Sequence, residues 1–246
     1  MKYYFYNTFV NVLNQEEYLE YIDKSLNTSG TTLFYYLNSY SFYLANNNND
    51  FQKAMELADF VIADGYSIVK VLGKIHNINI NKVVFTYSFF SFLADFFIKN
   101  KLRIYFLGGK EAVIQKSIKK CHENYSDLKI AGYRNGYFNS QKESDQIIQN
   151  INNSKPDILI VGMGMPRAEI WIDQYKHQIN AKCIFSVGGF FDFLASEKKI
   201  APKFLYNSGF EWVFRMIQEP NRLAIRYLKA NISLIIKFVR LKLKNY

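Results

Sequence analysis

The sequence predicts an α/β fold in which a Rossmann-like, mostly parallel sheet is flanked by helices, with a helical appendage at the C-terminus. Short apolar runs end in glycine turns, and stretches with helical spacing separate them, as in successive β-α-β units. The runs are nearly continuous in apolar residues, which is typical of strands buried on both faces. The chain has 246 residues, of which 49% are hydrophobic, so it can bury a core and is not a disordered protein.

We expect six strands along the chain. Residues 103–110 show the pattern, because the run RIYFLGG ends in two glycines and leads into a stretch whose apolar positions fit a helix. No linker interrupts the pattern before about residue 200, which predicts an α/β domain over 1–200 and a helical appendage over 201–246. The expected strands lie in 31–38, 58–65, 103–110, 128–132, 157–166 and 183–193.

The ends of these runs carry the candidate binding residues. Ligands of open α/β sheets bind at the carboxyl ends of the strands, where helix N-termini offer free N–H groups to phosphate. Many of the positions are glycines, which let a ligand approach the backbone. The residues concerned are Asn38, Asp64, Gly108, Gly109, Gly162, Gly164, Gly188 and Gly189.

Asp64 is the candidate general base. It follows the apolar run FVIA and precedes Gly65, which places its carboxylate at the mouth of a strand. A carboxylate in that position can take a proton from an acceptor hydroxyl. Asp-Gly is also a common turn sequence, and the spacing alone leaves both interpretations open.

Several function classes lack their motifs. The Gly162-Met163-Gly164 turn has Arg167 where a dinucleotide-binding fingerprint has its third glycine, which disfavours NAD. There is no Walker A lysine motif, no Asp-x-Asp and no cluster with metal-ligand spacing, so the sequence predicts neither a cofactor nor a metal. The two cysteines fit a reducing compartment, and we expect no signal peptide or membrane-spanning run.

The net charge of +10 is concentrated at the C-terminus. Seven of the 31 basic residues and none of the 21 acidic ones lie in 222–246, which leaves 24 basic residues for the rest of the chain. A basic tail on a nearly neutral body indicates an anionic surface as its partner. Nucleic acid is disfavoured, because an arm that binds it needs charge and solubility more than the many Leu and Ile residues of this tail.

The basic residues of the tail follow a helical spacing. At about 100° per residue, all but Lys242 fall in one narrow stripe, and apolar residues fill much of the remaining surface. The pattern predicts a membrane-binding helix that lies in the headgroup plane, with its basic face drawn to anionic lipid. A helix packed on the body or on a partner subunit is the alternative. The stripe consists of Arg222, Arg226, Lys229, Lys237, Arg240 and Lys244.

Six longer motifs stand in order along the chain. They are ADFVIADG (58–65), FLGGK (106–110), NGYF (135–138), PDILIVGMGMPRAEIWI (156–172), VGGFFDFLASEKKIAPKFL (187–205) and GFEWVFRMIQEPNR (209–222). In these motifs the chain resembles the WecG/TagA/CpsF family of bacterial glycosyltransferases (glycosyltransferase family 26) over nearly its whole length. The resemblance implies inverting, metal-independent transfer from a UDP-sugar, often UDP-N-acetylmannosamine or its uronic acid. It also implies an acceptor sugar on undecaprenyl diphosphate at the inner membrane face, and products that feed wall teichoic acid, enterobacterial common antigen, capsule or exopolysaccharide.

The resemblance assigns roles to single residues. Asp64 matches the family's proposed base, Asn38 matches an asparagine at the sugar pocket, and Arg215 and Arg222 match appendage arginines that meet diphosphates. A forked guanidinium suits that task, and we expect Glu211 to hold Arg215 by an i,i+4 pair. Backbone N–H groups of the three glycine turns would hold the diphosphate in place of a metal. The expected substrate-binding residues are Tyr36, Asn38, Lys82, Gly108, Gly109, Gly162, Gly164, Pro166, Arg167, Glu169, Gly188 and Gly189.

Three departures from the family pattern surround the expected donor sugar. Tyr36 replaces a threonine, Lys82 an arginine, and Ala168 a glutamine that would contact ligand. A hexose donor other than N-acetylmannosamine fits them better than loss of activity; a non-catalytic nucleotide-sugar-binding protein of polysaccharide assembly is the alternative. We expect a cytoplasmic protein held peripherally at the membrane. The sequence leaves the acceptor, the linkage and the oligomeric state open, a homo-oligomer included.

Overall fold

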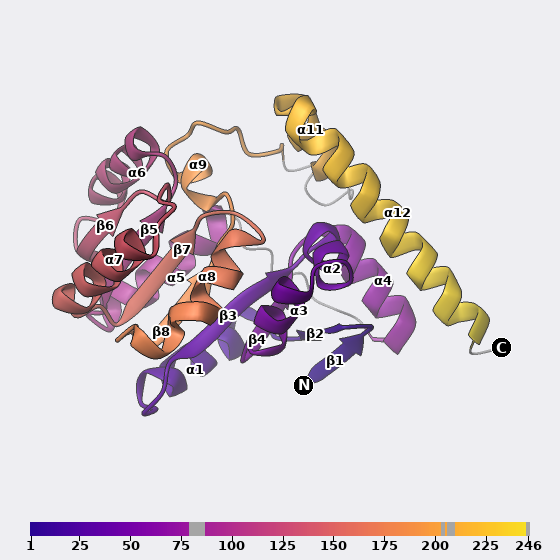
Figure 1. Cartoon of the computed structure of the whole chain (residues 1–246), viewed down its shortest axis with the longest axis horizontal. Helices are drawn as coiled ribbons and strands as arrows, with labels where there is room; N and C mark the ends of the chain where they lie inside the picture. The colour runs from indigo at the N-terminus through magenta and orange to yellow at the C-terminus, as the bar shows by residue number, and fades with distance from the viewer. Residues whose placement is uncertain (79–86, 203–204, 206–209, 245–246) are drawn as a thin grey trace.

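The computed structural model describes residues 1–78, 87–202, 205 and 210–244. The protein is built on a sheet of eight strands in the order β1-β2-β4-β3-β8-β7-β5-β6 (Figure 1). Neighbouring strands run parallel, except that β1 and β2 form an antiparallel pair at one edge. The predicted α/β class with a mostly parallel sheet is therefore confirmed.

All six expected strands are present. They are β3 (Thr32–Leu37), β4 (Phe60–Ala63), β5 (Arg103–Gly108), β6 (Lys129–Arg134), β7 (Ile158–Gly162) and β8 (Cys183–Ser186). Two further strands, β1 (Lys2–Phe5) and β2 (Thr8–Asn11), extend the sheet and were not expected, because their runs mix polar with aromatic residues. The side chain of Asn11 joins β2 to the sheet by accepting the N–H of Val61 at 2.9 Å.

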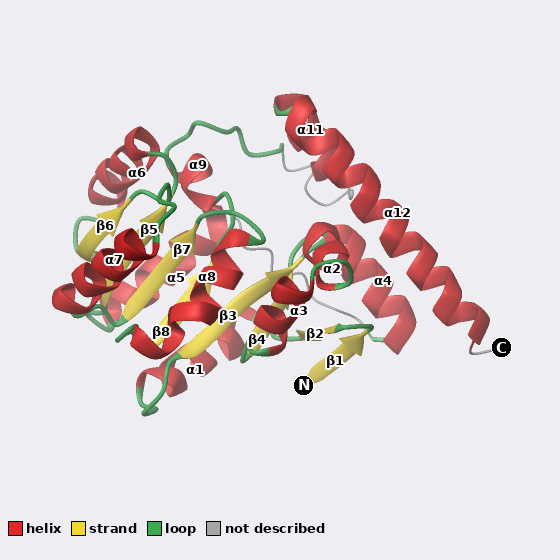
Figure 2. Ribbon diagram, viewed as in Figure 1, coloured by secondary structure: helices red, strands yellow, loops and turns green. Residues whose placement is uncertain are grey.

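Helices cover both faces of the sheet (Figure 2). Along β3, Leu33, Tyr35 and Leu37 enter one hydrophobic cluster, whereas Phe34 and Tyr36 enter the other, as the alternation of a strand requires. The first face carries α2 (Ser39–Ala45), α3 (Asn49–Glu56), α4 (Tyr66–His76), α7 (Gln141–Ser154) and α8 (Arg167–Tyr175), which runs into a 3-10 turn (Lys176–Gln178). The second face carries α1 (Gln15–Leu26), α5 (Tyr87–Lys99), α6 (Glu111–Asn124) and α9 (Phe190–Leu194).

Two helices end the described chain, namely α11 (Glu211–Gln218) and α12 (Pro220–Lys244). The long α12 packs along α2 and also contacts α4 (Figure 1). Leu223, Ala230 and Leu234 form its buried face. The expected C-terminal helix is thus present, while the domain boundary at residue 200 stays a prediction. Within the described residues, no helix has both the length and the hydropathy that crossing a bilayer requires.

Candidate active site

A cavity of about 710 Å³ lies at the carboxyl ends of the strands, between the sheet and α11–α12. The predicted site residues that line it are Tyr36, Asn38, Asp64, Gly109, Gly162, Gly164, Arg167, Gly188, Gly189, Arg215 and Arg222. Gly108, Pro166 and Glu169 do not line it, and Lys82 lies outside the described residues. The structure therefore brings together predicted residues that are more than 180 positions apart in the sequence, from Tyr36 to Arg222.

Asp64 stands at the end of β4, half-buried in the wall of this cavity. Its backbone N–H donates to the carbonyl oxygen of Leu37 at 2.7 Å, which fixes the end of β4 beside the end of β3. The next residue, Gly65, has φ +98°, and a Cβ added there would meet nothing within 4 Å. The turn therefore needs a glycine for its backbone conformation, and it leaves open space beside the carboxylate.

Asn38 both caps a helix and lines the cavity. Its Oδ1 accepts the N–H groups of Tyr40 and Ser41, each at 3.0 Å, at the start of α2. This cap fixes the orientation of the amide, so that its NH₂ group is the part left to donate to a ligand. Tyr36 is 4% exposed, and its hydroxyl lies 3.2 Å from that of Tyr18. Tyr36 therefore lines the cavity as a nearly buried side chain whose hydroxyl is engaged with Tyr18.

Two glycine turns offer backbone to the cavity. Gly164 has φ +77° and Gly188 has φ +56°, and a Cβ on either would meet nothing within 4 Å. Among the described residues, the N–H groups of Gly164, Gly188 and Gly189 have no protein acceptor. Such N–H groups beside a cavity suit an anion such as a diphosphate.

The turn at Gly108 and Gly109 differs from the expectation that its N–H groups hold phosphate. The N–H of Gly109 donates to the carbonyl oxygen of Gly162 at 3.1 Å and is therefore already engaged. A Cβ on Gly108 would come within 2.3 Å of the Gly162 carbonyl oxygen and 2.7 Å of the Phe191 ring, and a Cβ on Gly162 within 2.6 Å of the same ring. Gly108 therefore allows the close approach of the Gly162 backbone, and both glycines make room for Phe191 of α9.

Arg215 projects from α11 toward Asp64. Its guanidinium pairs with Glu211 at 2.6 Å, which confirms the expected i,i+4 pair, and stacks 5.1 Å from the Phe193 ring centre. Burial alone would lower the pKa of Arg215, but the carboxylates of Glu211 and Asp64 raise it overall. Arg215 therefore stays fully charged beside the candidate base.

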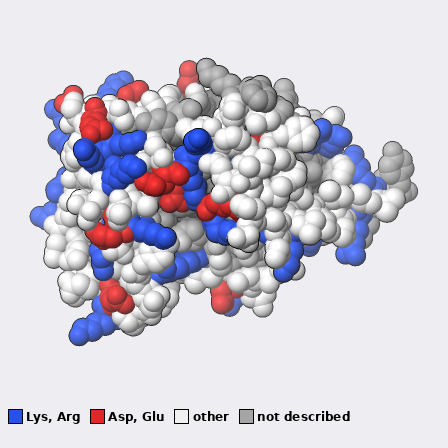
Figure 3. Space-filling view, turned by 90° about the horizontal axis from the view of Figure 1, so that it is seen from above, with Lys and Arg blue, Asp and Glu red and all other residues white. Residues whose placement is uncertain are grey.

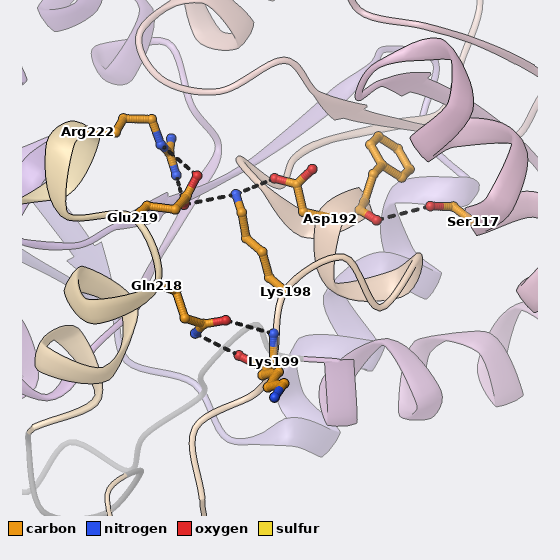
Figure 4. A network of polar contacts seen from close by, with 8 residues as sticks. Ser117, Asp192, Lys198, Lys199, Gln218, Glu219 and Arg222 are labelled. Atoms are coloured by element: carbon orange, nitrogen blue, oxygen red, sulfur yellow. Dashed lines mark hydrogen bonds and ion pairs between the residues drawn. The ribbon is translucent and has the colours of Figure 1, made fainter.

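A group of polar contacts joins α11 and α12 to the body beside the cavity (Figure 4). Lys198 pairs with Asp192 of α9 and, at 3.1 Å, with Glu219, which also pairs with Arg222. Gln218 bonds both the N–H and the carbonyl oxygen of Lys199, at 2.9 and 3.1 Å. Arg222 is thereby tied to a carboxylate while its side chain stays 55% exposed.

The basic stripe of α12 is divided between two environments. The Arg226 guanidinium lies 3.7 Å from the ring centre of Tyr40 and lines the cavity, and Lys237 donates to Asn46 Oδ1 at 2.8 Å. Lys229 and Arg240 are exposed. The spacing predicted that all these cations would lie on one free face. In the structure they do not, because α12 packs on α2 along part of the stripe. The side chain of Lys244 lies outside the described residues.

The cavity is also lined by basic side chains that were not predicted to lie there. Besides Arg215 and Arg222, it is lined by Lys110, Lys198 and Arg226. Arg226 is four residues after Arg222, so its helical spacing places it near that residue, and Lys198 falls inside one of the six motifs. On the face shown in Figure 3, side chains of both signs are interspersed over the body. Within the described part of the chain, no three His, Cys, Asp or Glu side chains gather as metal ligands.

Glu169 is predicted to bind substrate, but it lies beneath the cavity wall. It is 1% exposed and accepts a hydrogen bond from Ser186 Oγ at 2.6 Å, while its Oε2 has no partner among the described residues. Burial raises the pKa of its carboxyl, and the bond from Ser186 opposes the rise only in part. Glu169 therefore links the start of α8 to the end of β8, and its carboxyl is harder to ionise than an exposed one.

We expect Glu169→Gln to stabilise the protein at neutral pH. Because the pKa is higher in the folded than in the unfolded state, the wild type loses stability as the pH rises from the unfolded pKa, near 4.3, through the folded one. Each unit of that shift corresponds to roughly 1.4 kcal/mol, and the amide removes the loss. Chemical unfolding of both proteins at pH 4.5 and 7.5 measures the effect. A difference in unfolding free energy that is equal at the two pH values would contradict this assignment.

Comparisons with known proteins identify the family of the chain. Residues 3–246 match the profile of the glycosyl transferase WecG/TagA/CpsF family. The chain is 30% identical over 181 residues (72% of this chain, 68% of the relative) to the N-acetylglucosaminyldiphosphoundecaprenol N-acetyl-beta-D-mannosaminyltransferase of Bacillus spizizenii. It is 28% identical over 214 residues (86% and 80%) to the enzyme of the same name from Bacillus subtilis. A third relative, the UDP-Gal:alpha-D-GlcNAc-diphosphoundecaprenol beta-1,4-galactosyltransferase of Shigella boydii, is 27% identical over 183 residues (74% and 75%). The chain therefore belongs to the WecG/TagA/CpsF family of glycosyltransferases.

Proposed function

We propose that this glycosyltransferase moves a sugar from a UDP-sugar, with inversion and without a divalent metal, to a sugar carried on undecaprenyl diphosphate. The observation that carries the proposal is the cavity in which Asp64 and Asn38 from the sheet face Arg215 and Arg222 from the appendage. Asp64 and Asn38 can bind and deprotonate a neutral sugar acceptor, whereas Arg215 and Arg222 can bind a diphosphate. The names of the relatives support the acceptor class, because all three contain a diphosphoundecaprenol carrying N-acetylglucosamine.

The residues of the cavity fit a single displacement. The acceptor hydroxyl oxygen attacks the anomeric carbon of the donor, and its proton passes to the carboxylate of Asp64. The bond between that carbon and the UDP oxygen breaks at the same time, so the sugar inverts and UDP leaves with its electron pair. Arg215, helped by Arg222, balances the charge that grows on the leaving diphosphate, and the free N–H groups of Gly164, Gly188 and Gly189 hold its other oxygens.

The donor is a hexose of the N-acetylmannosamine type or another hexose. Two of the relatives are named for N-acetylmannosaminyl transfer and one for galactosyl transfer, so the donor varies among them. In this chain the bulky Tyr36 lines the cavity, and Ala168 is fully buried and offers no amide to a ligand. Both features favour a donor sugar that forms fewer hydrogen bonds with this part of the cavity.

A panel of UDP-sugars tests the proposal. Purified protein is mixed with each donor and with lipid-linked N-acetylglucosaminyl diphosphate, and UDP release is measured with and without EDTA. We expect one donor to support release that depends on the acceptor and is unchanged by EDTA. Binding of UDP-sugars without release from any of them would favour a nucleotide-sugar-binding protein.

The outer face of α12 is proposed to hold the enzyme at the cytoplasmic membrane, on its inner side. Ile236, Val239 and Leu243 are 46%, 46% and 72% exposed, and on a helical projection Lys229 and Arg240 flank them on one side and Lys242 on the other. An exposed apolar row between basic residues is typical of a helix at a headgroup surface. Membrane contact is thus assigned to this row and its flanking cations, with Arg226 and Lys237 facing the body.

A triple variant with Asp in place of Ile236, Val239 and Leu243 is expected to bind anionic liposomes at least about tenfold more weakly, because three apolar contacts with the bilayer are lost. Sedimentation with the liposomes measures the binding. Leu57→Asp, which changes an exposed leucine of the body, is the matched control and should bind as the wild type does. Equal binding by the triple variant and the wild type would remove the row from membrane attachment.

A further inference from the structure

A second cavity runs along the appendage, outside the site described above. It is a groove of about 840 Å³ between α4, α11 and α12. Val71, Met216, Leu228, Ile232, Ile235 and Phe238 are among its apolar wall residues. The α12 residues that line it run from Ala224 to Phe238, a length of about 21 Å at 1.5 Å per residue.

The groove adjoins the candidate active site. Tyr227 lines both cavities, with the active site on one side and the groove on the other. The wall formed by α4 begins at Tyr66, two residues after Asp64, so the turn that carries the candidate base also opens the groove. Arg222, which lines the first cavity, precedes the groove residues of α12, and Arg226, which also lines the first cavity, follows the first two of them.

This combination of adjoining environments suits one kind of ligand. The first cavity offers a carboxylate and arginines, and the groove beside it offers an apolar channel. A sugar fits beside the carboxylate, a diphosphate beside the arginines, and a hydrocarbon chain in the channel. The surfaces for the polar and apolar parts of a lipid-linked sugar diphosphate therefore adjoin one another.

We propose that the groove between α4 and α12 binds the first isoprene units of the acceptor's polyprenyl chain. The inference rests on the proposed function, because it takes the acceptor to be a polyprenyl-linked sugar. The groove would draw the start of the lipid chain out of the bilayer and align the diphosphate with Arg215 and Arg222. Lys70 and Lys74, which also line the groove from α4, lie where they can meet lipid headgroups.

Filling the groove with a large side chain tests this inference. Ala224→Trp and Asn231→Trp place bulk at two points along it, and both residues lie on a helix surface that is not fully buried. Ala112→Trp, on the exposed surface of α6, is the matched control. Thermal unfolding of each variant checks that it is folded. The readout is the KM for two acceptors in detergent: the sugar diphosphate of a long polyprenol, and the same sugar diphosphate on a short alkyl chain.

Both groove variants are expected to raise the KM for the polyprenyl acceptor at least about tenfold, because each excludes several methylene groups from the groove. Their KM for the short acceptor and for the donor should stay at the wild-type value, as should every value for Ala112→Trp. Unchanged KM for the polyprenyl acceptor in folded groove variants would overturn the inference and leave the chain in the bilayer. Equal losses with both acceptors would also overturn it, since the groove would then act only on the structure of the site.

Binding of a fluorescent polyprenyl diphosphate that carries no sugar separates this inference from the proposed function. If the wild type transfers no sugar but binds this probe, and Ala224→Trp weakens the binding, the groove assignment holds and the transfer reaction is wrong. If the wild type transfers sugar but binds the probe no better than Ala224→Trp does, the reaction holds and the groove assignment is wrong. Pairing of two chains through this face, seen as a dimer that Ala224→Trp dissociates, would likewise replace the lipid as occupant.

Discussion

Asp64→Asn is expected to lower kcat for sugar transfer by about 10² to 10⁴, the usual contribution of a general base, while the affinity for UDP stays near that of the wild type. The amide keeps the size of the side chain at the end of β4 and loses the ability to take a proton. The open space beside Gly65 gives the acceptor hydroxyl room to reach this position. Steady-state transfer rates, with UDP binding measured by calorimetry, check the result.

Asp59→Asn is the control for Asp64→Asn, because it makes the same change at the opposite end of β4. Asp59 precedes β4 at its other end, and its carboxylate accepts the N–H of Leu33 at 2.8 Å, a bond that an amide oxygen can keep. We expect this variant to retain its activity, so a loss confined to Asp64→Asn reports on chemistry and not on the charge of the strand. If Asp64→Asn transfers sugar at the wild-type rate, the proton acceptor is a different group.

Arg215→Ala is expected to lower kcat/KM by about 10² to 10³, in the range seen when one group that stabilises transition-state charge is removed. Arg215 is held by Glu211 and by stacking on Phe193, so it enters the reaction already oriented. Arg215→Lys should recover only part of the rate, because an ammonium cannot form the forked contact with phosphate oxygens. The rates of both variants with the donor that the UDP-sugar panel identifies measure the effect.

Arg103→Ala provides the comparison for Arg215, since Arg103 begins β5 at the amino end of the sheet, away from the cavity. It should transfer sugar as the wild type does. A folded Arg215→Ala protein with a rate within about threefold of the wild type would show that Arg215 does not stabilise the leaving group. The charge on the leaving diphosphate would then be balanced by other groups of the cavity.

The strands and the cavity residues could be predicted from the sequence for a simple physical reason. A buried parallel strand must be apolar along its length, and the chain must turn at its end, so runs such as FVIA before Asp64 mark both the strand and the site. Strand β2, between β1 and β4, has no such signature, because it is only four residues long and polar residues, Thr8 and Asn11, form its two ends; it was not predicted. A short strand with polar ends does not stand out as an apolar run.

The roles of the glycines and of the basic stripe could not be predicted in the same way. Gly108 and Gly164 look alike in the sequence, yet one makes room for the Phe191 ring and the other opens into the cavity. The stripe on α12 is likewise regular, but the contacts of Arg226 with Tyr40 and of Lys237 with Asn46 depend on how α12 sits on α2. Both distinctions arise from tertiary packing between segments that lie far apart in the chain.

The most direct test of the proposed reaction is the mass of the acceptor lipid after incubation with the full-length protein, its donor and EDTA. We expect the lipid to gain the mass of one hexose-type sugar for each UDP released, and Asp64→Asn to produce almost none of this product. UDP released without any change in the mass of the lipid would make the protein a nucleotide-sugar hydrolase. Such a result would contradict the single site proposed here, in which Asp64 of the body and Arg215 of the appendage act together on a lipid-linked sugar.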